Sequence, residues 1–102
     1  MENSAMRLSE LLKGMEAQIE GSDPEIVEVR DDARAVQPGD LFVAISGRSD
    51  GQASIKEAAE RGARAIVIEW PMPFPGARAL VPSAAEAWAG IAAARARRKL
   101  TE

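Results

Sequence analysis

Apolar residues near the start of the chain recur at the spacing of a helix. Four of them fall at i, i+3, i+4 and i+7 and so share one helix face: Leu8, Leu11, Leu12 and Met15. Gly14 lies near the end of this stripe, and glycine weakens a helix interior, so the spacing predicts a short helix. Residues 20–24 contain a glycine and a proline and are predicted to form a loop.

Short apolar runs bounded by turn residues predict strands in the middle of the chain. The β-branched residues at 26, 27 and 29 favour a strand within residues 26–36. Pro38 and Gly39 are typical of a type II turn, since glycine accepts the positive φ at its third position. The run 40–45 that follows is almost wholly apolar after its aspartate, which predicts a buried strand.

The next segment predicts a helix followed by another buried strand. Ser54 and Glu57 match a capping box, which places the start of a helix there, and Gly62 stands where a C-terminal glycine would end it. Residues 65–69 form the next apolar run. The order of strand, helix and strand predicts a right-handed βαβ crossover.

The last third predicts a turn-rich segment, a short strand and a helix. Residues 70–76 hold three prolines and a glycine, and residues 79–81 suit a short strand. Ser83 and Glu86 form a second capping box. The helix after it presents an apolar face closed by an arginine: Trp88, Ile91, Ala92 and Arg95. Together the elements predict an α/β fold with a small mixed sheet flanked by helices, in a single domain over residues 1–102.

Composition narrows the chemistry open to the chain. Its formal net charge is −3 and it has four aromatic residues, Phe42, Trp70, Phe74 and Trp88, so nucleic acid is not an expected partner. It has no cysteine and no histidine, which excludes thiolate chemistry and the commonest general base and metal ligand. No run is long enough to span a bilayer and no signal sequence is present, so we expect a cytoplasmic protein without a membrane partner.

Residues 32–51 are the most informative stretch for function. Two strand ends and a loop bounded by Gly47 and Gly51 can converge there, and glycines let a ligand approach the backbone closely. Backbone groups at such a point can read a flat polar ring such as uracil. Two core strands joined by ordinary turns would give the same pattern, so this interpretation needs independent support.

Several motifs of this stretch and of its flanks resemble those of MurE-type Mur ligases. Residues 6–12 are similar to the opening of those proteins, and Asp32-Ala33-Arg34 stands where they have D-S-R. Residues 38–44 match their P-G-D-L-F-V-A signature, Gly47, Asp50 and Gly51 match their G…D-G loop, and residues 55–69 continue the register. The match covers nearly the whole chain. The resemblance implies that this chain is the N-terminal, UDP-binding domain of a ligase that extends the peptide of UDP-N-acetylmuramoyl-dipeptide. Such a ligase acts in peptidoglycan biosynthesis, so the resemblance also implies a role in cell-wall formation, cell shape and cell division.

The resemblance also implies a set of residues that hold the uridine end of the substrate: Asp31, Ala33, Arg48, Ser49 and Asp50. Two departures bear on this site. Ala33 replaces the serine of the family, which removes a hydroxyl contact and leaves backbone and methyl contacts. The loop at 47–51 is shorter than in many relatives, and Gln52 replaces a histidine.

The charged residues of this stretch have two interpretations each. Arg34 either faces a diphosphate or forms a structural ion pair with Asp32 or Asp40, and we favour the ion pair. Arg48 is either a ligand contact or a solvated arginine. Adjacent acids on a strand point to opposite faces, so Asp31 and Asp32 do not make a general acid–base pair. We interpret the acidic residues from 23 to 32 as a solvated edge, and we expect no metal site.

The parts needed for catalysis are not found in the sequence. Mur ligases carry a central ATPase domain whose glycine-rich loop contains Gly-Lys-Thr. The three lysines here, Lys13, Lys56 and Lys99, do not follow a glycine. We therefore expect no catalytic residue and no cofactor in this chain, with ATP and Mg²⁺ bound by the full ligase. The expected partners are the UDP-N-acetylmuramoyl-peptide and the remaining ligase domains, and we expect an excised or naturally truncated domain of an ATP-dependent amide-bond-forming ligase.

Two alternatives stay open on the sequence. One is the equivalent domain of a MurF-type ligase, although residues 6–12 favour MurE. The other is an interaction module that kept the fold and lost nucleotide binding, an idea motivated by Ala33 and the short loop.

Overall fold

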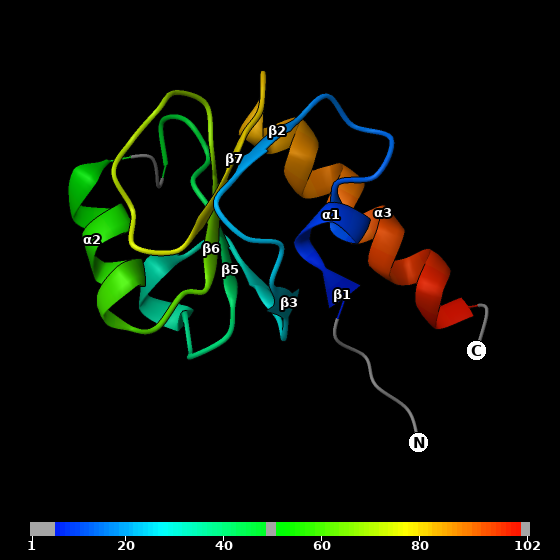
Figure 1. The fold of residues 1–102 in the computed structure, drawn as a ribbon, viewed down its shortest axis with the longest axis horizontal. Helices are drawn as coiled ribbons and strands as arrows, with labels where there is room; N and C mark the ends of the chain where they lie inside the picture. Colours follow the sequence, from blue (N-terminus) through cyan, green and yellow to red (C-terminus); the bar gives the residue numbers. More distant parts are fainter. Residues whose placement is uncertain (1–5, 49–50, 101–102) are drawn as a thin grey trace.

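The fold is a small mixed sheet with helices on both sides (Figure 1). The computed structural model describes residues 6–48 and 51–100. In chain order the elements are β1 (Met6–Arg7), α1 (Leu8–Leu11), β2 (Gln18–Glu20), β3 (Glu25–Ile26), β4 (Val29–Arg30), the 3-10 helix η1 (Ala33–Ala35), β5 (Leu41–Val43), α2 (Gln52–Glu60), β6 (Ala65–Ile68), β7 (Ala77–Leu80) and α3 (Ala84–Leu100). The predicted fold class is confirmed.

The main sheet has five strands in the order β2-β7-β6-β5-β4. Strands β4 to β7 are mutually parallel, and β2 pairs antiparallel with β7 at the edge. The parallel pairing of β5 and β6 across α2 confirms the predicted βαβ unit. Strands β1 and β3 form a separate antiparallel ribbon. In the parallel part of the sheet, all carboxyl ends therefore meet at one edge.

Each face of the sheet is covered by its own apolar cluster. Leu41 and Val43 of β5 belong to the cluster under α1 and α3, whereas Phe42 of the same strand belongs to the cluster under α2 and η1. Successive side chains of a strand point to opposite faces, so a strand covered on both sides must be apolar at every position. This is why the runs at residues 41–43 and 65–68 are continuous rather than alternating.

Two predicted glycine turns are confirmed. Gly39 has φ 92°, and the Asp40 N–H donates to the Gln37 carbonyl at 3.1 Å, which closes the turn at Pro38-Gly39. Gly62 has φ 96° and ends α2 as predicted. The N–H groups of residues 62 and 63 donate to the carbonyls of residues 59 and 58, the paired bonds of a Schellman motif.

The N-terminal third differs from the prediction. Helix α1 is short, as expected, but the strand expected within residues 26–36 is two strands in different sheets, β3 and β4. Strand β2 was not predicted at all. It has one apolar residue, Ile19, between two exposed polar residues, too short a segment for alternation to identify it.

The helix starts and faces also needed correction. Helix α2 begins at Gln52 after Gly51, so the capping box predicted at Ser54 is wrong. In α3 the Glu86 N–H donates to Ser83 Oγ at 3.2 Å, which confirms one half of the second box. The buried face of α3 consists of three alanines and one isoleucine, namely Ala84, Ala87, Ile91 and Ala94. Ala92, which was predicted to lie on that face, is exposed.

Candidate functional site

The candidate site forms where β4 and β5 end side by side. Asp31 directly follows β4, and Arg48 lies in the turn that follows β5. The two strands are parallel neighbours, with Val29 opposite Leu41, so the segments after them leave the same edge of the sheet. Ligands of open α/β sheets bind at this edge, outside the carboxyl ends of the strands.

A pocket of about 460 Å³ lies at this edge between β4, η1, the turn after β5, and α2. Its lining includes the sequence-predicted Asp31, Ala33 and Arg48. The structure thus brings together three of the five predicted site residues. The other two, Ser49 and Asp50, lie outside the described residues.

Ala33 forms the apolar part of the pocket wall. It is the first residue of η1 and is buried against Val36 and Phe42 in the cluster under α2. Its backbone and methyl group are what it offers to the pocket, as expected for an alanine at this position.

The contacts of Arg34 confirm that it forms a structural ion pair with Asp32. Its Nε and Nη2 donate to the two carboxylate oxygens of Asp32 at 3.1 and 3.0 Å, and its backbone N–H donates to the same side chain at 3.0 Å. Asp32 therefore caps η1 and holds the guanidinium in a fork. The side-chain hydrogen bonds from Arg34, followed by its backbone bond, lower the pKa of Asp32 below its ordinary value.

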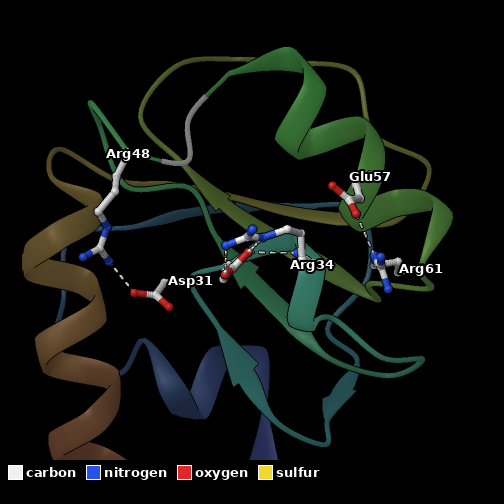
Figure 2. Close-up of polar contacts among 6 residues, drawn as sticks. Asp31, Arg34, Arg48, Glu57 and Arg61 are labelled. Atoms are coloured by element: carbon white, nitrogen blue, oxygen red, sulfur yellow. Dashed lines mark hydrogen bonds and ion pairs between the residues drawn. The ribbon is translucent and has the colours of Figure 1, made fainter.

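Arg48 and Asp31, which both line the pocket, form an ion pair. The Arg48 guanidinium donates to a carboxylate oxygen of Asp31, and Figure 2 shows the two side chains pointing toward each other from different segments. Asp31 and Asp32 therefore engage different arginines.

Besides the predicted site residues, the lining holds Asp32 and Arg34, which were predicted to form an ion pair, and two residues of α2 that were not predicted to lie there. Ser54 and Glu57 project from α2 into the lining. They were assigned to a helix cap, but the N-cap of the helix is Gly51, three residues before Ser54, so neither is needed there. Their i, i+3 spacing was the available signal, since it places both on one helix face. Glu57 also accepts a hydrogen bond from Arg61 Nε at 2.9 Å.

Asp40 serves the fold rather than the pocket. Its side chain is 2% exposed and accepts hydrogen bonds from Arg30 Nε at 3.0 Å and from the Gln37 N–H at 2.9 Å. It does not line the pocket. Of the two carboxylates expected as partners of Arg34, Asp32 is the one that pairs with it, and Asp40 pairs with Arg30 instead.

The acidic edge predicted at residues 23–32 is largely paired. Asp23 accepts hydrogen bonds from the Ser9 N–H and Oγ at 2.8 and 2.7 Å, and the Ser9 hydroxyl is the main reason that the pKa of Asp23 is lowered. Glu28 pairs with Arg95 of α3, which likewise lowers the pKa of Glu28. These carboxylates stay partly exposed to solvent, as the solvated-edge interpretation has it, and they also hold neighbouring elements together.

A second carboxylate link lies further along the same edge of the sheet. Glu69, after β6, accepts from Ser46 Oγ and from the Ala84 N–H at the start of α3, the latter at 2.7 Å. These two hydrogen bonds lower the pKa of Glu69, the Ser46 bond most. The carboxylate therefore occupies the N-terminus of α3, where negative charge is favoured.

Another pocket, of about 300 Å³, lies over β2 and β7 and is mainly apolar, with Ile68, Met72 and Leu80 in its wall. Its charged pair is Glu20 with Arg78, at 3.3 Å. Polar groups from several segments converge instead on the pocket at β4 and β5, and we take that pocket as the candidate site.

Across residues 6–48 and 51–100, no three acidic, cysteine or histidine side chains gather closely enough to hold a metal ion. In the same ranges, no helix combines the length and the apolar character required to cross a bilayer.

The sequence is similar to those of curated UDP-N-acetylmuramyl-tripeptide synthetases and a related ligase. It is 47% identical over 97 residues to the UDP-N-acetylmuramyl-tripeptide synthetase of Roseiflexus sp. (strain RS-1), across 87% of this chain and 19% of that protein. It is 37% identical over 100 residues to the protein of the same name from Deinococcus radiodurans, across 83% and 20%. It is 42% identical over 67 residues to the UDP-N-acetylmuramoyl-L-alanyl-D-glutamate--2,6-diaminopimelate ligase of Syntrophomonas wolfei, across 63% and 14%. No family model matches the chain.

The fold is similar to that of solved Mur ligases. A crystal structure of MurF from Acinetobacter baumannii superposes with a TM-score of 0.76 at 18% identity, covering 92% of this chain and 21% of that one. A structure of the UDP-N-acetylmuramoylalanyl-D-glutamyl-2,6-diaminopimelate--D-alanyl-D-alanyl ligase from the same organism gives a TM-score of 0.75 at 17% identity, covering 96% and 23%. At this identity the likeness concerns the fold alone. By sequence and by fold together, the chain is a homologue of the Mur ligases that spans about a fifth of their length and resembles their N-terminal domain.

Proposed function

We propose that this chain binds the uridine end of a UDP-N-acetylmuramoyl-peptide and is the substrate-recruiting domain of a MurE-type ligase in cytoplasmic peptidoglycan biosynthesis. The observation that carries the proposal is the pocket at the ends of β4 and β5. It joins Asp31, Ala33 and Arg48, the described residues that the resemblance assigned to uridine.

The chemistry of the pocket suits a nucleoside. Uridine offers an N–H and ribose hydroxyls as donors and base carbonyls as acceptors. The carboxylate of Asp31 accepts hydrogen bonds, the guanidinium of Arg48 donates them, and the hydroxyl of Ser54 does both. The methyl group of Ala33 adds an apolar contact for the ring. A pocket with a few convergent polar groups and an apolar wall is the usual form of a small-molecule site.

The sequence relatives favour the MurE type over the MurF type. The relatives at 37–47% identity carry the names tripeptide synthetase and diaminopimelate ligase. The MurF structures share 17–18% identity with this chain and support the common fold only. In this proposal ATP, Mg²⁺ and the incoming amino acid are bound by the rest of the ligase.

The internal pairing of the pocket favours one second candidate. Arg34 and Arg48 each have a carboxylate partner within the pocket lining, so neither needs a ligand to neutralise it. A module that kept the fold and lost nucleotide binding would show the same pairing. Nucleotide titration separates the two functions.

The first test is an NMR titration of the ¹⁵N-labelled chain with uridine and with UDP. We expect the amide signals of Ala33, Gly47, Arg48 and Gly51 to shift and saturate. The signals of Gln18 and Leu80, which line the apolar pocket, serve as an internal control and should stay unchanged. Absence of any saturable shift at millimolar ligand would overturn the proposal and favour the interaction module.

A variant at Ala33 tests the position of the uridine. Ala33→Ser restores the hydroxyl that the resembled family has at this position. One additional hydrogen bond is worth about 0.5–1.5 kcal/mol, so the affinity for uridine should rise about two- to tenfold. Unchanged affinity in a folded variant would place the uridine away from η1.

A further inference from the structure

The pocket at the ends of β4 and β5 contains its own counter-ions. Arg34 pairs with Asp32, and Arg48 pairs with Asp31. Figure 2 shows Arg34, the pair of Arg48 and Asp31, and the pair of Glu57 on α2 with Arg61 just after that helix. Among the described lining residues there are three carboxylates and two guanidiniums. The third carboxylate, Glu57, is balanced by Arg61 from outside the lining.

This balance matters because the two halves of a uridine nucleotide differ in charge. The nucleoside is neutral and the diphosphate is anionic. A diphosphate brought to this pocket meets guanidiniums that are already neutralised, and it meets the carboxylates that neutralise them. The described lining therefore gives no net attraction for an anion, while its hydrogen-bonding groups still suit the nucleoside.

The two arginine pairs are not equally fixed. Asp32 holds the Arg34 guanidinium through both carboxylate oxygens and also caps η1, so this pair is built into the local backbone structure. Asp31 meets Arg48 through one guanidinium nitrogen. Arg48 is the more exposed partner of that pair, with 61% of its side chain accessible against 32% for Asp31. Arg48 is therefore the cation that a change at Asp31 would release toward a ligand.

We infer that Asp31 is a specificity-determining residue of this pocket: by neutralising Arg48, it makes the pocket select the neutral nucleoside end of a ligand over its diphosphate. This inference rests on the proposed uridine-binding function. It goes beyond that function by assigning Asp31 a role toward the charge of the ligand rather than only a contact with it.

The test compares the affinities for uridine and for UDP by isothermal titration calorimetry, in the wild-type chain and in Asp31→Asn. In the wild type, UDP should bind no more than about threefold tighter than uridine. Asparagine keeps the shape of aspartate and removes its charge, so Arg48 becomes free to meet the diphosphate. An exposed charge pair is worth up to about 1 kcal/mol, so D31N should shift the affinity ratio roughly three- to fivefold toward UDP.

Two further variants show whether the effect passes through Arg48. Glu57→Gln removes one negative charge from the same pocket but frees Arg61, which does not line it, so this charge-matched variant should shift the ratio much less than D31N. Combining D31N with Arg48→Gln should cancel the shift. Added salt should also reduce the gain in D31N, since it arises from charge.

The outcomes separate this inference from the proposed function. Absence of uridine binding in the wild type would remove the proposed function, and the inference with it. Uridine binding with an unchanged UDP-to-uridine ratio in folded D31N, or an equal shift in E57Q, would overturn the inference alone. If D31N does not fold, Arg48→Gln alone decides: it leaves the Asp31 charge without its partner and should weaken UDP binding more than uridine binding. Equal weakening of both would contradict the inference.

Discussion

At the scale of single residues, the aspartate of the Pro-Gly-Asp-Leu-Phe-Val-Ala motif has a structural role. Asp40 is buried at the start of β5, and it joins the Arg30 side chain at the end of β4 to the backbone of the turn before β5. Its carbonyl also accepts from the Arg64 N–H at 2.8 Å, just before β6. One residue thus ties three segments together, and the motif positions the strands whose far ends carry the pocket.

Replacing Asp40 by alanine should therefore destabilise the chain strongly. The variant leaves the Arg30 guanidinium and the Gln37 N–H without their buried acceptor, which costs about 2–4 kcal/mol of unfolding free energy. Urea denaturation followed by circular dichroism measures this loss. The matched control is Glu20→Ala, which breaks the half-exposed pair with Arg78 and should cost less than about 1 kcal/mol. Similar losses in both variants would show that burial of Asp40 does not matter.

At the scale of elements, Glu69 connects three of them through one carboxylate. It follows β6, accepts from Ser46 after β5, and accepts from the first N–H group of α3 at Ala84. The position of a carboxylate at a helix N-terminus satisfies a backbone donor that has no partner within the helix. This link fixes the start of α3 relative to the sheet edge on which the candidate pocket lies.

The lowered pKa of Glu69 predicts a dependence of stability on pH. The folded-state pKa lies below the ordinary value of 4.5, so the charged carboxylate stabilises the folded state fully above that value. The contribution is lost as the pH falls from 4.5 through the lower folded-state pKa. Urea denaturation at steps between pH 7 and pH 3 should show a decline in unfolding free energy that is smaller in Glu69→Gln.

Other carboxylates contribute to the same dependence of the unfolding free energy on pH. Asp23, Glu28 and Asp32 also have lowered pKa values and lose their contributions in the same direction as the pH falls. The comparison with Glu69→Gln isolates one of them, and Glu60→Gln on the exposed side of α2 is the control variant. Identical pH profiles for the wild type and Glu69→Gln would contradict the link between the sheet edge and α3.

At the scale of the whole molecule, one sheet is shared by two apolar clusters. Leu41 and Phe42 are adjacent and fully buried, yet they belong to clusters on opposite faces. Removing either side chain leaves a cavity against the same five strands. Both clusters pack against the same strands. If one cluster unfolds, the strands that support the other cluster are disrupted as well.

We therefore expect Leu41→Ala and Phe42→Ala each to lower the unfolding free energy by about 3–5 kcal/mol while unfolding stays a single transition. Far-UV circular dichroism and the fluorescence of Trp70 and Trp88 should give coincident denaturation curves. Val27→Ala, at a side chain that is 57% exposed, is the control and should cost less than about 1 kcal/mol. Different midpoints for the two probes would show that the clusters unfold separately.

Features that depend on near neighbours along the chain could be predicted from the amino-acid sequence. The continuous apolar runs at residues 41–43 and 65–68 required strands covered on both faces, and Gly39 and Gly62 required a turn and a helix end, because glycine accepts a positive φ at low cost. The resemblance of residues 32–51 to a known motif set pointed to the edge of the sheet where the pocket lies. Each of these patterns spans only a few residues, and the structure of such a short segment depends mainly on its local backbone geometry.

The pairing of charged residues, and their placement in the pocket, depend on how the strands and helices are arranged in space. Arg48 and Asp31 are 17 residues apart in sequence. They pair because the parallel strands β4 and β5 end at the same edge of the sheet, and each residue follows one of these strands. Ser54 and Glu57 enter the pocket because α2 starts at Gln52 rather than at a side-chain cap. Such contacts depend on the order and direction of strands in the sheet. Many strand orders satisfy the same local pattern, so the sequence pattern alone does not select among them.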